Sequence, residues 1–156
     1  MNKKNTSNGF TFIEIIIVLA IFTIISSIVF ASFSALTNKQ ALDKEVDNIK
    51  SIIQKTRLES LNAKNGNTHA ITFASTTVVT SETSTTTTTA YSISPDIVAQ
   101  DINLKIIGSG AATSTVFFAK ITGMTNATGT ITYVLKKGST VLGTTTLKIN
   151  ALGTVE

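Results

Sequence analysis

The residues that most constrain the chemistry of this chain are a glycine and a glutamate near its N-terminus. Gly9 ends a polar, basic segment, MNKKNTSNG, and Glu14 stands near the front of the apolar segment that follows. No charged residue occurs between Ile15 and Asn38. Because a carboxylate in a membrane-spanning segment is costly, it needs a partner or a proton. Glu14 is therefore expected to meet a cation or to be protonated, unless it lies just inside the interface and is simply solvated.

The segment behind Glu14 must position this carboxylate, and it is long enough to cross a membrane as a helix. The uncharged run contains 24 residues. At about 1.5 Å per residue it spans roughly 36 Å, against about 30 Å for the hydrocarbon core of a bilayer. It contains neither Pro nor Gly. Inside lipid a helix is favoured because it satisfies every backbone polar group.

Three interpretations of this N-terminal region compete. It can be a secretory signal peptide cut behind its apolar stretch, where SFSA, ending at Ala35, offers small residues. It can also be a plain signal anchor whose lysines, Lys3 and Lys4, stay on the cytoplasmic side. The third interpretation differs from these two because it accounts for Gly9 and Glu14 together.

The third interpretation comes from the motif GFTFIE, Gly9–Glu14, which is followed by IIIVLAI. This motif resembles the processing site of type IV prepilins and pseudopilins. The resemblance implies that the chain is cut after Gly9, that the helix is kept, and that the same peptidase N-methylates the new first residue, Phe10. It also implies that Glu14 contacts the amino group of Phe10 in a neighbouring subunit and sets the axial register of the assembly.

The same resemblance implies a location and a set of partners. The chain would be a single-pass protein of the inner (cytoplasmic) membrane with a cytoplasmic N-terminus, and afterwards part of an extracytoplasmic pilus or pseudopilus. The expected partners are the prepilin peptidase/N-methyltransferase, other pilin or pseudopilin subunits, the inner-membrane assembly platform and, before assembly, membrane lipid. The chain is expected to be a structural subunit, and a minor subunit is favoured over a major one. Type IV pilus, type II secretion pseudopilus and competence pilus all stay open.

The helix is expected to continue beyond the apolar run and to extend from about Phe10 to Ala63. Apolar residues recur there with a helical rhythm, and charges of alternating sign occupy the other sides. A stop signal, Asn65-Gly66, follows Lys64. The expected buried face consists of Leu42, Val46, Ile49, Ile52, Ile53, Leu58 and Leu61.

After Gly66 the helical period disappears, and short β-type runs alternate with clusters of Gly, Asn and Ser. Alternation such as Ile131/Tyr133/Leu135 directs one set of side chains toward a core. The stretch Ser81–Thr89, SETSTTTTT, is predicted to be a flexible loop or a polar edge. The expected strands are His69–Ala74, Thr76–Thr80, Ala90–Ser94, Ile102–Ile107, Val116–Thr122, Thr130–Lys136 and Thr144–Ile149.

These elements predict an α+β fold of the pilin type. A long N-terminal helix, half membrane-spanning and half amphipathic, packs on a C-terminal antiparallel β-sheet domain. The expected division is a leader, 1–9, a transmembrane and assembly helix, 10–36, an amphipathic continuation, 37–65, and a β-rich globular domain, 66–156.

A second resemblance concerns the C-terminal half. The stretches Gln54–Phe73 and Gly129–Glu156 resemble parts of the GspH/FimT group of minor pseudopilins, in which a Gly, here Gly153, sits near the end of the last strand. Some FimT-like minor pilins act in DNA uptake through basic C-terminal residues. A pilus-associated DNA-uptake receptor is therefore an alternative function.

The DNA alternative would depend on Lys136, Lys137 and Lys148. The chain ends in ALGTVE rather than in a basic cluster. Thirteen basic and nine acidic residues give a net charge of +4, and loss of two leader lysines would leave +2. Three lysines release few counterions, so affinity for DNA at physiological salt would be low.

The sequence contains no motif for catalysis or for a metal site. It has no cysteine and no phosphate-binding loop, HExxH or GxSxG motif. The single histidine, His69, is expected on the surface at a strand edge, and Asp96 and Asp101 are expected in a turn and N-cap. No catalytic residue, metal or cofactor is predicted, and the chain is not expected to be an enzyme.

Overall fold

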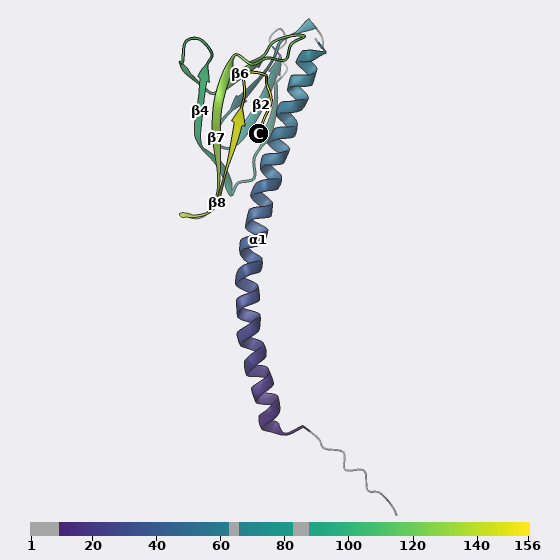
Figure 1. Ribbon diagram of the computed structural model, residues 1–156, viewed down its shortest axis with the longest axis vertical. Coiled ribbons are helices and arrows are strands. Elements are labelled where there is room, and N and C mark those ends of the chain that lie inside the picture. Colours follow the sequence, from purple (N-terminus) through teal and green to yellow (C-terminus); the bar gives the residue numbers. More distant parts are fainter. Residues whose placement is uncertain (1–9, 63–65, 83–87) are drawn as a thin grey trace, which may run out of the picture. The chain divides into compact units, whose positions relative to one another are not determined.

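A computed structural model of the chain describes residues 10–62, 66–82 and 88–156 (Figure 1). The predicted leader, 1–9, and the predicted helix end at Lys64 lie outside these residues. The chain forms two compact units, Met1–Thr37 and Asn38–Glu156. One long helix, α1, Phe12–Leu61, contributes residues to both units. With two antiparallel sheets in the second unit, the layout confirms the predicted α+β fold.

In the first unit α1 is apolar on all sides and buries none of them. Its most apolar 18-residue window reaches a mean hydropathy of 2.8 and is 0% buried, and its length and composition are sufficient to span a membrane. Two of its hydroxyls bond to its own backbone: Thr23 Oγ1 donates to Ala20 O and Ser27 Oγ donates to Ile24 O, both at 2.8 Å. These polar groups therefore need no outside partner in an apolar environment.

In the second unit one face of α1 is buried. Leu42, Val46, Ile49 and Ile53 are at most 2% exposed, which confirms the predicted stripe. The prediction for Leu58 was wrong, because its side chain is 55% exposed. Leu58 lies two residues from both Thr56 and Ser60, so it points away from the side on which these two are buried.

Thr56 and Ser60 extend the buried stripe toward the end of the helix, although both are polar. The Thr56 hydroxyl donates to Ile52 O at 2.9 Å, within the helix. The Ser60 hydroxyl donates to Phe118 O at 2.7 Å and so joins α1 to a strand 58 residues away. Hydrogen bonding removes most of the cost of burying these hydroxyls, which is why polar residues can continue an apolar face.

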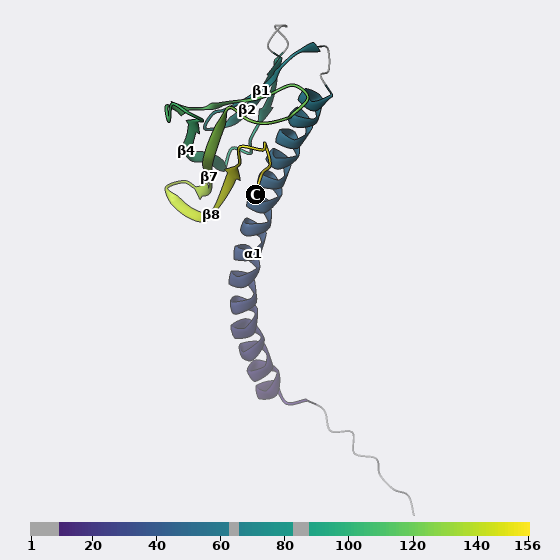
Figure 2. The same ribbon diagram turned by 45° about the horizontal axis from the view of Figure 1, so that its top comes forward.

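Within the described residues eight strands form two four-stranded antiparallel sheets, shown from two directions in Figures 1 and 2. The first sheet has the order β3-β2-β1-β6 and the second has the order β5-β4-β7-β8. The strands of the first sheet are β1, His69–Phe73, β2, Thr77–Glu82, β3, Thr88–Ser92, and β6, Thr115–Phe118. Those of the second are β4, Ile97–Ile106, β5, Ala112–Thr113, β7, Ala127–Lys137, and β8, Thr140–Ile149.

Three predicted strands need the largest corrections. β4 begins at Ile97 rather than Ile102, so Asp101 lies within a strand and not at a helix N-cap, whereas Asp96 does lie in a turn. β8 begins at Thr140 rather than Thr144. β6 ends at Phe118, and the chain turns where the strand was expected to continue to Thr122. Within that turn Ile121 adopts a φ of 67°, a conformation that β-branched residues rarely take. The two-residue strand β5 was not predicted.

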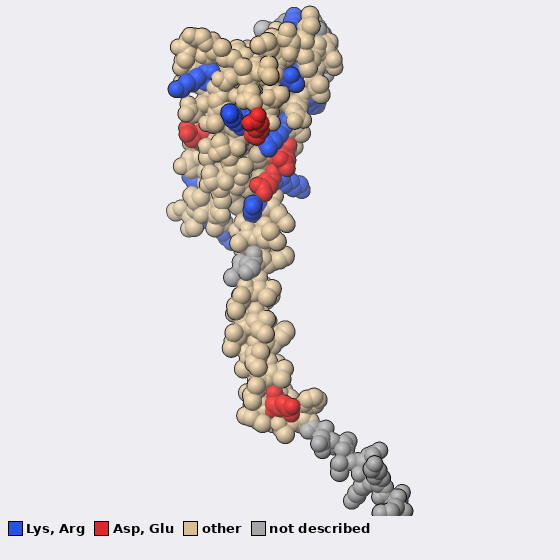
Figure 3. All heavy atoms as spheres, viewed as in Figure 1, with Lys and Arg blue, Asp and Glu red and all other residues tan. Residues whose placement is uncertain are grey.

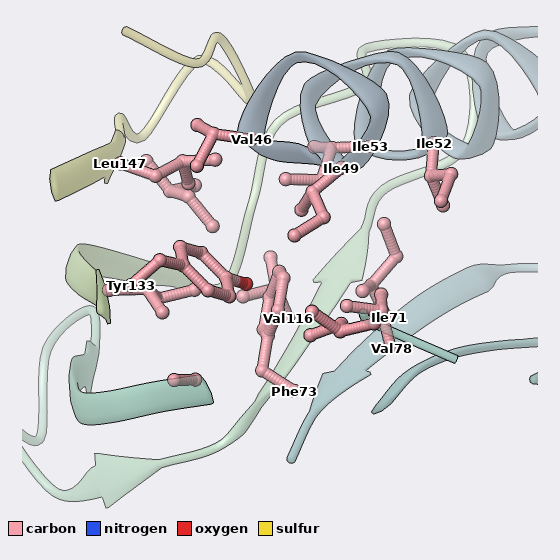
Figure 4. Packing of buried hydrophobic residues seen from close by; sticks show 14 of the residues in the cluster. Val46, Ile49, Ile52, Ile53, Ile71, Phe73, Val78, Val116, Tyr133 and Leu147 are labelled. Carbon is pink, nitrogen blue, oxygen red and sulfur yellow. The ribbon is translucent and has the colours of Figure 1, made fainter. Parts of the chain in front are cut away.

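The core of the second unit lies between α1 and the two sheets (Figure 4). Val46 lies beside Leu147 of the second sheet, whereas Ile49 and Ile53 point toward the first sheet, where Val116 and Ile71 lie. The predicted alternation in β7 and β8 is confirmed, because Ile131, Tyr133, Leu135, Leu147 and Ile149 are all buried. One amphipathic segment of the helix thus packs against both sheets and covers their common core.

Candidate processing and assembly site

The N-terminal site residues lie around the start of α1. Gly9 lies outside the described residues. Phe10 is 82% exposed and precedes the helix, while Glu14 lies in the first helical turn and is also exposed. Figure 3 shows this acidic group at the start of an otherwise uncharged surface. A carboxylate at the N-terminus of a helix is favoured by the partial positive charge of the free backbone N–H groups.

Thr11 and Glu14 exchange hydrogen bonds across the first turn. The Glu14 N–H donates to Thr11 Oγ1 at 3.3 Å, and the Thr11 N–H donates to Glu14 Oε2 at 3.4 Å. The helix begins at Phe12, so Thr11 is its N-cap residue and Glu14 is its third residue. This contact was not predicted, although a Thr followed three residues later by a Glu, just before an apolar run, is a readable capping signal.

A shallow hollow of about 260 Å³ lies beside the same turn and is lined by Phe10, Glu14, Ile15, Val18 and Leu19. Its walls are apolar, so Glu14 lines it with the carbon atoms of its side chain. Such a surface suits an apolar side chain. It offers no pair of groups for nucleophilic or acid–base catalysis.

The comparison with protein-family models bears on this end of the chain. Residues 4–30 match the model of the prokaryotic N-terminal methylation motif. The matched range includes Gly9, Phe10 and Glu14. The match supports a type IV pilin-like or pseudopilin subunit, anchored in a membrane, processed by prepilin peptidase and assembled with other pilins. Neither the curated proteins nor the solved structures contain a significant match, and membership of the GspH/FimT group is not shown.

The lysines considered for DNA binding do not gather at one place. Lys148 on β8 pairs with Thr130 on β7, whereas Lys136 and Lys137 pair with Val141 and Thr140. Thr130 and Lys136 are six residues apart on one strand, or roughly 20 Å at about 3.3 Å per residue. This spacing gives no compact basic patch from these three residues.

Gly153 lies in a turn four residues after the end of β8, rather than near the end of that strand. Its φ is 75°, and an added Cβ would lie 2.3 Å from Gly123 O and 2.9 Å from Arg57 Nε. The Arg57 Nε donates to Gly123 O at 3.3 Å. Gly153 is therefore needed so that two turns and one arginine of α1 can pack closely.

The expectation for His69 was wrong, since this residue is buried with 2% of its surface exposed. β1 is an inner strand, flanked by β2 and β6, and His69 shares a face with the core residue Ile71. Its Nδ1 lies 4.0 Å from Glu59 Oε2 of α1. Its Nε2 has no hydrogen-bond partner among the described residues. A sequence pattern cannot reveal this burial, because it depends on the helix end covering the sheet.

Within the part of the chain that the structure describes, no cluster of three or more His, Asp or Glu side chains could hold a metal ion. His69 lines a polar hollow of about 210 Å³ together with Lys55, Glu59 and Glu82. Glu82 Oε2 accepts a hydrogen bond from Asn67 Nδ2 at 3.2 Å. These groups join the helix end to the first sheet through polar contacts.

Proposed function

We propose that this chain is a structural subunit of a type IV pilus or of a type II secretion pseudopilus. Prepilin peptidase cuts it after Gly9 and N-methylates Phe10, and the subunit then assembles through residues 10–36. The observation that carries the proposal is the match of residues 4–30 to the N-terminal methylation motif. By this proposal the chain is a building block rather than an enzyme.

The surface of the first unit supports assembly through the helix. Large apolar side chains on every side of it are exposed, including Phe12, Ile25 and Phe30. A contiguous apolar surface of this extent needs lipid or other apolar helices to cover it. The same residues can therefore be covered by lipid before assembly and by neighbouring helices afterwards.

Glu14 supports a specific contact within that assembly. Cleavage after Gly9 creates an α-amino group on Phe10, which is protonated at neutral pH because its pKa is ordinarily about 8. An ammonium next to a carboxylate in an apolar surrounding makes a charge-assisted hydrogen bond and neutralises both charges. In our proposal the Phe10 amine of one subunit meets Glu14 of the next. The hollow beside that Glu14 accepts the apolar side chain of the same Phe10.

For the subunit type we favour a minor pilin or pseudopilin similar to the GspH/FimT group. The supporting observation is the resemblance of Gln54–Phe73 and Gly129–Glu156 to that group. The alternative of a DNA-uptake receptor has less support, because Lys148 is far along the β7–β8 ladder from Lys136 and Lys137.

The proposal is tested by the mass of the mature N-terminal peptide, isolated from the membrane fraction of a host with a prepilin peptidase. We expect a peptide that begins with N-methylated Phe10. A start near Thr37 would indicate a secreted domain, and an intact Met1 would indicate a signal anchor. The matched variant is Gly9→Val, which should remain a full-length precursor because its branched side chain does not fit a cleft shaped for glycine. Normal cleavage of that variant would contradict the proposal.

A further inference from the structure

The start of α1 is defined by one short structural feature, the pair of reciprocal hydrogen bonds between Thr11 and Glu14. The hydroxyl of Thr11 accepts the Glu14 N–H at 3.3 Å, and the carboxylate of Glu14 accepts the Thr11 N–H at 3.4 Å. The Glu14 carboxylate thereby satisfies the Thr11 N–H, and the Thr11 hydroxyl gives the Glu14 N–H a second acceptor beside Thr11 O, which lies at 3.1 Å. This arrangement is a capping box, and it marks Phe12 as the first helical residue.

The sequence by itself would allow an earlier start. Ser7 and Asn8, one turn upstream, are also residue types that cap helices well. A helix begun there would include the bond between Gly9 and Phe10. Within a helix the carbonyl groups are engaged in hydrogen bonds and the side chains wind around the axis. A peptidase could then neither polarise that carbonyl nor bind the residues on both sides in one groove.

We propose that Thr11 is a positioning residue for maturation. Its capping box with Glu14 holds the start of the helix at Phe12 and so keeps Phe10 and its amide nitrogen outside the first helical turn. This inference rests on the proposed cleavage after Gly9. It gives Glu14 an earlier task than contact with a neighbour, because its carboxylate already has a partner in the unassembled precursor.

The capping role predicts a specific order among substitutions of Thr11. Valine has the same shape as threonine but no oxygen, so Thr11→Val removes the side-chain acceptor of the Glu14 N–H and leaves it only the backbone contact with the carbonyl of residue 11. Serine keeps a hydroxyl, and asparagine is a strong cap of a different shape. Thr11→Ser and Thr11→Asn should therefore behave like the natural protein, and Thr11→Val should not.

The experiment uses the full-length precursor in lipid bicelles and measures two quantities. The first is amide hydrogen exchange of residues 12–15 in the absence of peptidase. The second is kcat/KM for cleavage by prepilin peptidase. For Thr11→Val we expect exchange to become about fivefold faster, as the loss of one capping residue implies. We also expect kcat/KM to fall several-fold, while Thr11→Ser and Thr11→Asn stay within about twofold of the natural chain for both quantities.

Three outcomes would overturn the inference. If Thr11→Val exchanges faster but is cut at the normal rate, the helix start does not govern cleavage. If its cleavage falls without a change in exchange, Thr11 contacts the peptidase directly. If Thr11→Asn caps the helix yet is cut as poorly as Thr11→Val, the enzyme recognises the shape of threonine. In each of these cases the natural precursor is still cut after Gly9, so the proposed function survives, whereas failure to cut the natural precursor would refute that function instead.

Discussion

The two halves of α1 differ in what surrounds them, although they belong to one helix. Along the first unit the described apolar side chains of the helix are exposed on every side, and Glu14 is the only charged residue between Phe12 and Thr37. Along the second unit a single stripe is buried and charged residues occupy the remaining surface. The exposed apolar surface of the first segment thus needs other molecules to cover it, whereas the buried stripe of the second segment packs on the sheets of its own chain. Assembly and folding are assigned to different parts of the helix.

The largest expected effect comes from removing the first segment. Deletion of residues 1–36 should convert a membrane protein into a soluble monomer, because the exposed apolar surface is concentrated in that stretch. Sedimentation velocity would measure the oligomeric state, and circular dichroism would measure the fold. Persistent aggregation of the fragment 37–156 would mean that the second unit also depends on a partner for its stability.

A charge introduced on the buried stripe should unfold the second unit. Ile49→Asp places an unpaired carboxylate among core side chains, and we expect a loss of about 3 kcal/mol or more in unfolding free energy. The matched control is Asn48→Asp, which adds the same carboxylate to the adjacent, exposed position and should cost less than about 0.5 kcal/mol. Urea denaturation of the fragment 37–156 provides the comparison. Equal stability of the two variants would show that this face does not pack on the sheets in solution.

The corresponding substitution in the first segment should leave folding intact and reduce assembly. Glu14→Leu keeps the Thr11 hydroxyl but removes the carboxylate that accepts the Thr11 N–H, so membrane insertion should survive and leader cleavage should fall no further than in Thr11→Val. Incorporation into filaments should fall about tenfold, because the Phe10 amine of the neighbouring subunit loses its charged partner. Glu14→Asp should be intermediate, since its shorter side chain has less reach. The measurement is the amount of mature subunit in sheared filaments divided by the amount in the membrane. Equal ratios for Glu14→Leu and the natural chain would refute the pairing.

The smallest effect concerns a buried hydroxyl of the second unit. Burial, and to a lesser degree the nearby Glu45 carboxylate, raises the pKa of the Tyr133 phenol well above its ordinary value of 10.0. As the pH rises, the unfolded chain loses this proton before the folded chain does. The contribution of Tyr133 to the free energy of unfolding is therefore intact below about pH 10 and decreases above it by about 1.4 kcal/mol per pH unit.

The test of this effect is the pH dependence of stability. Tyr133→Phe should remove the part of the high-pH decline in unfolding free energy that Tyr133 causes. The part of the decline that comes from the titration of lysines should stay unchanged. Near pH 7 its stability should equal or exceed that of the natural protein, because the Tyr133 hydroxyl is buried without a partner among the described residues. Parallel curves for the two proteins between pH 8 and 11 would contradict the assignment.

Local patterns in the sequence were sufficient for the long helix and for the core faces of the main strands, but not for the bounds of β4, β6 and β8 or for the short strand β5. The rhythm of Leu42, Val46, Ile49 and Ile53 identified the buried stripe, and alternation identified the core faces of β7 and β8. The same kind of reasoning failed for Leu58 and His69. Apolar character favoured burial of Leu58 and polar character favoured exposure of His69, but both preferences were overridden by the position of the helix end above the first sheet.

The sequence by itself determined the features that depend on neighbouring residues along the chain. These are the uncharged run that needs lipid or other helices and the Gly9–Glu14 motif. Only the tertiary structure decided that His69 is enclosed and that Ser60 bonds to Phe118, 58 residues away. The physical reason is that burial of a polar side chain requires a hydrogen-bonding or covering group from a distant segment, and only the folded chain brings that group within reach.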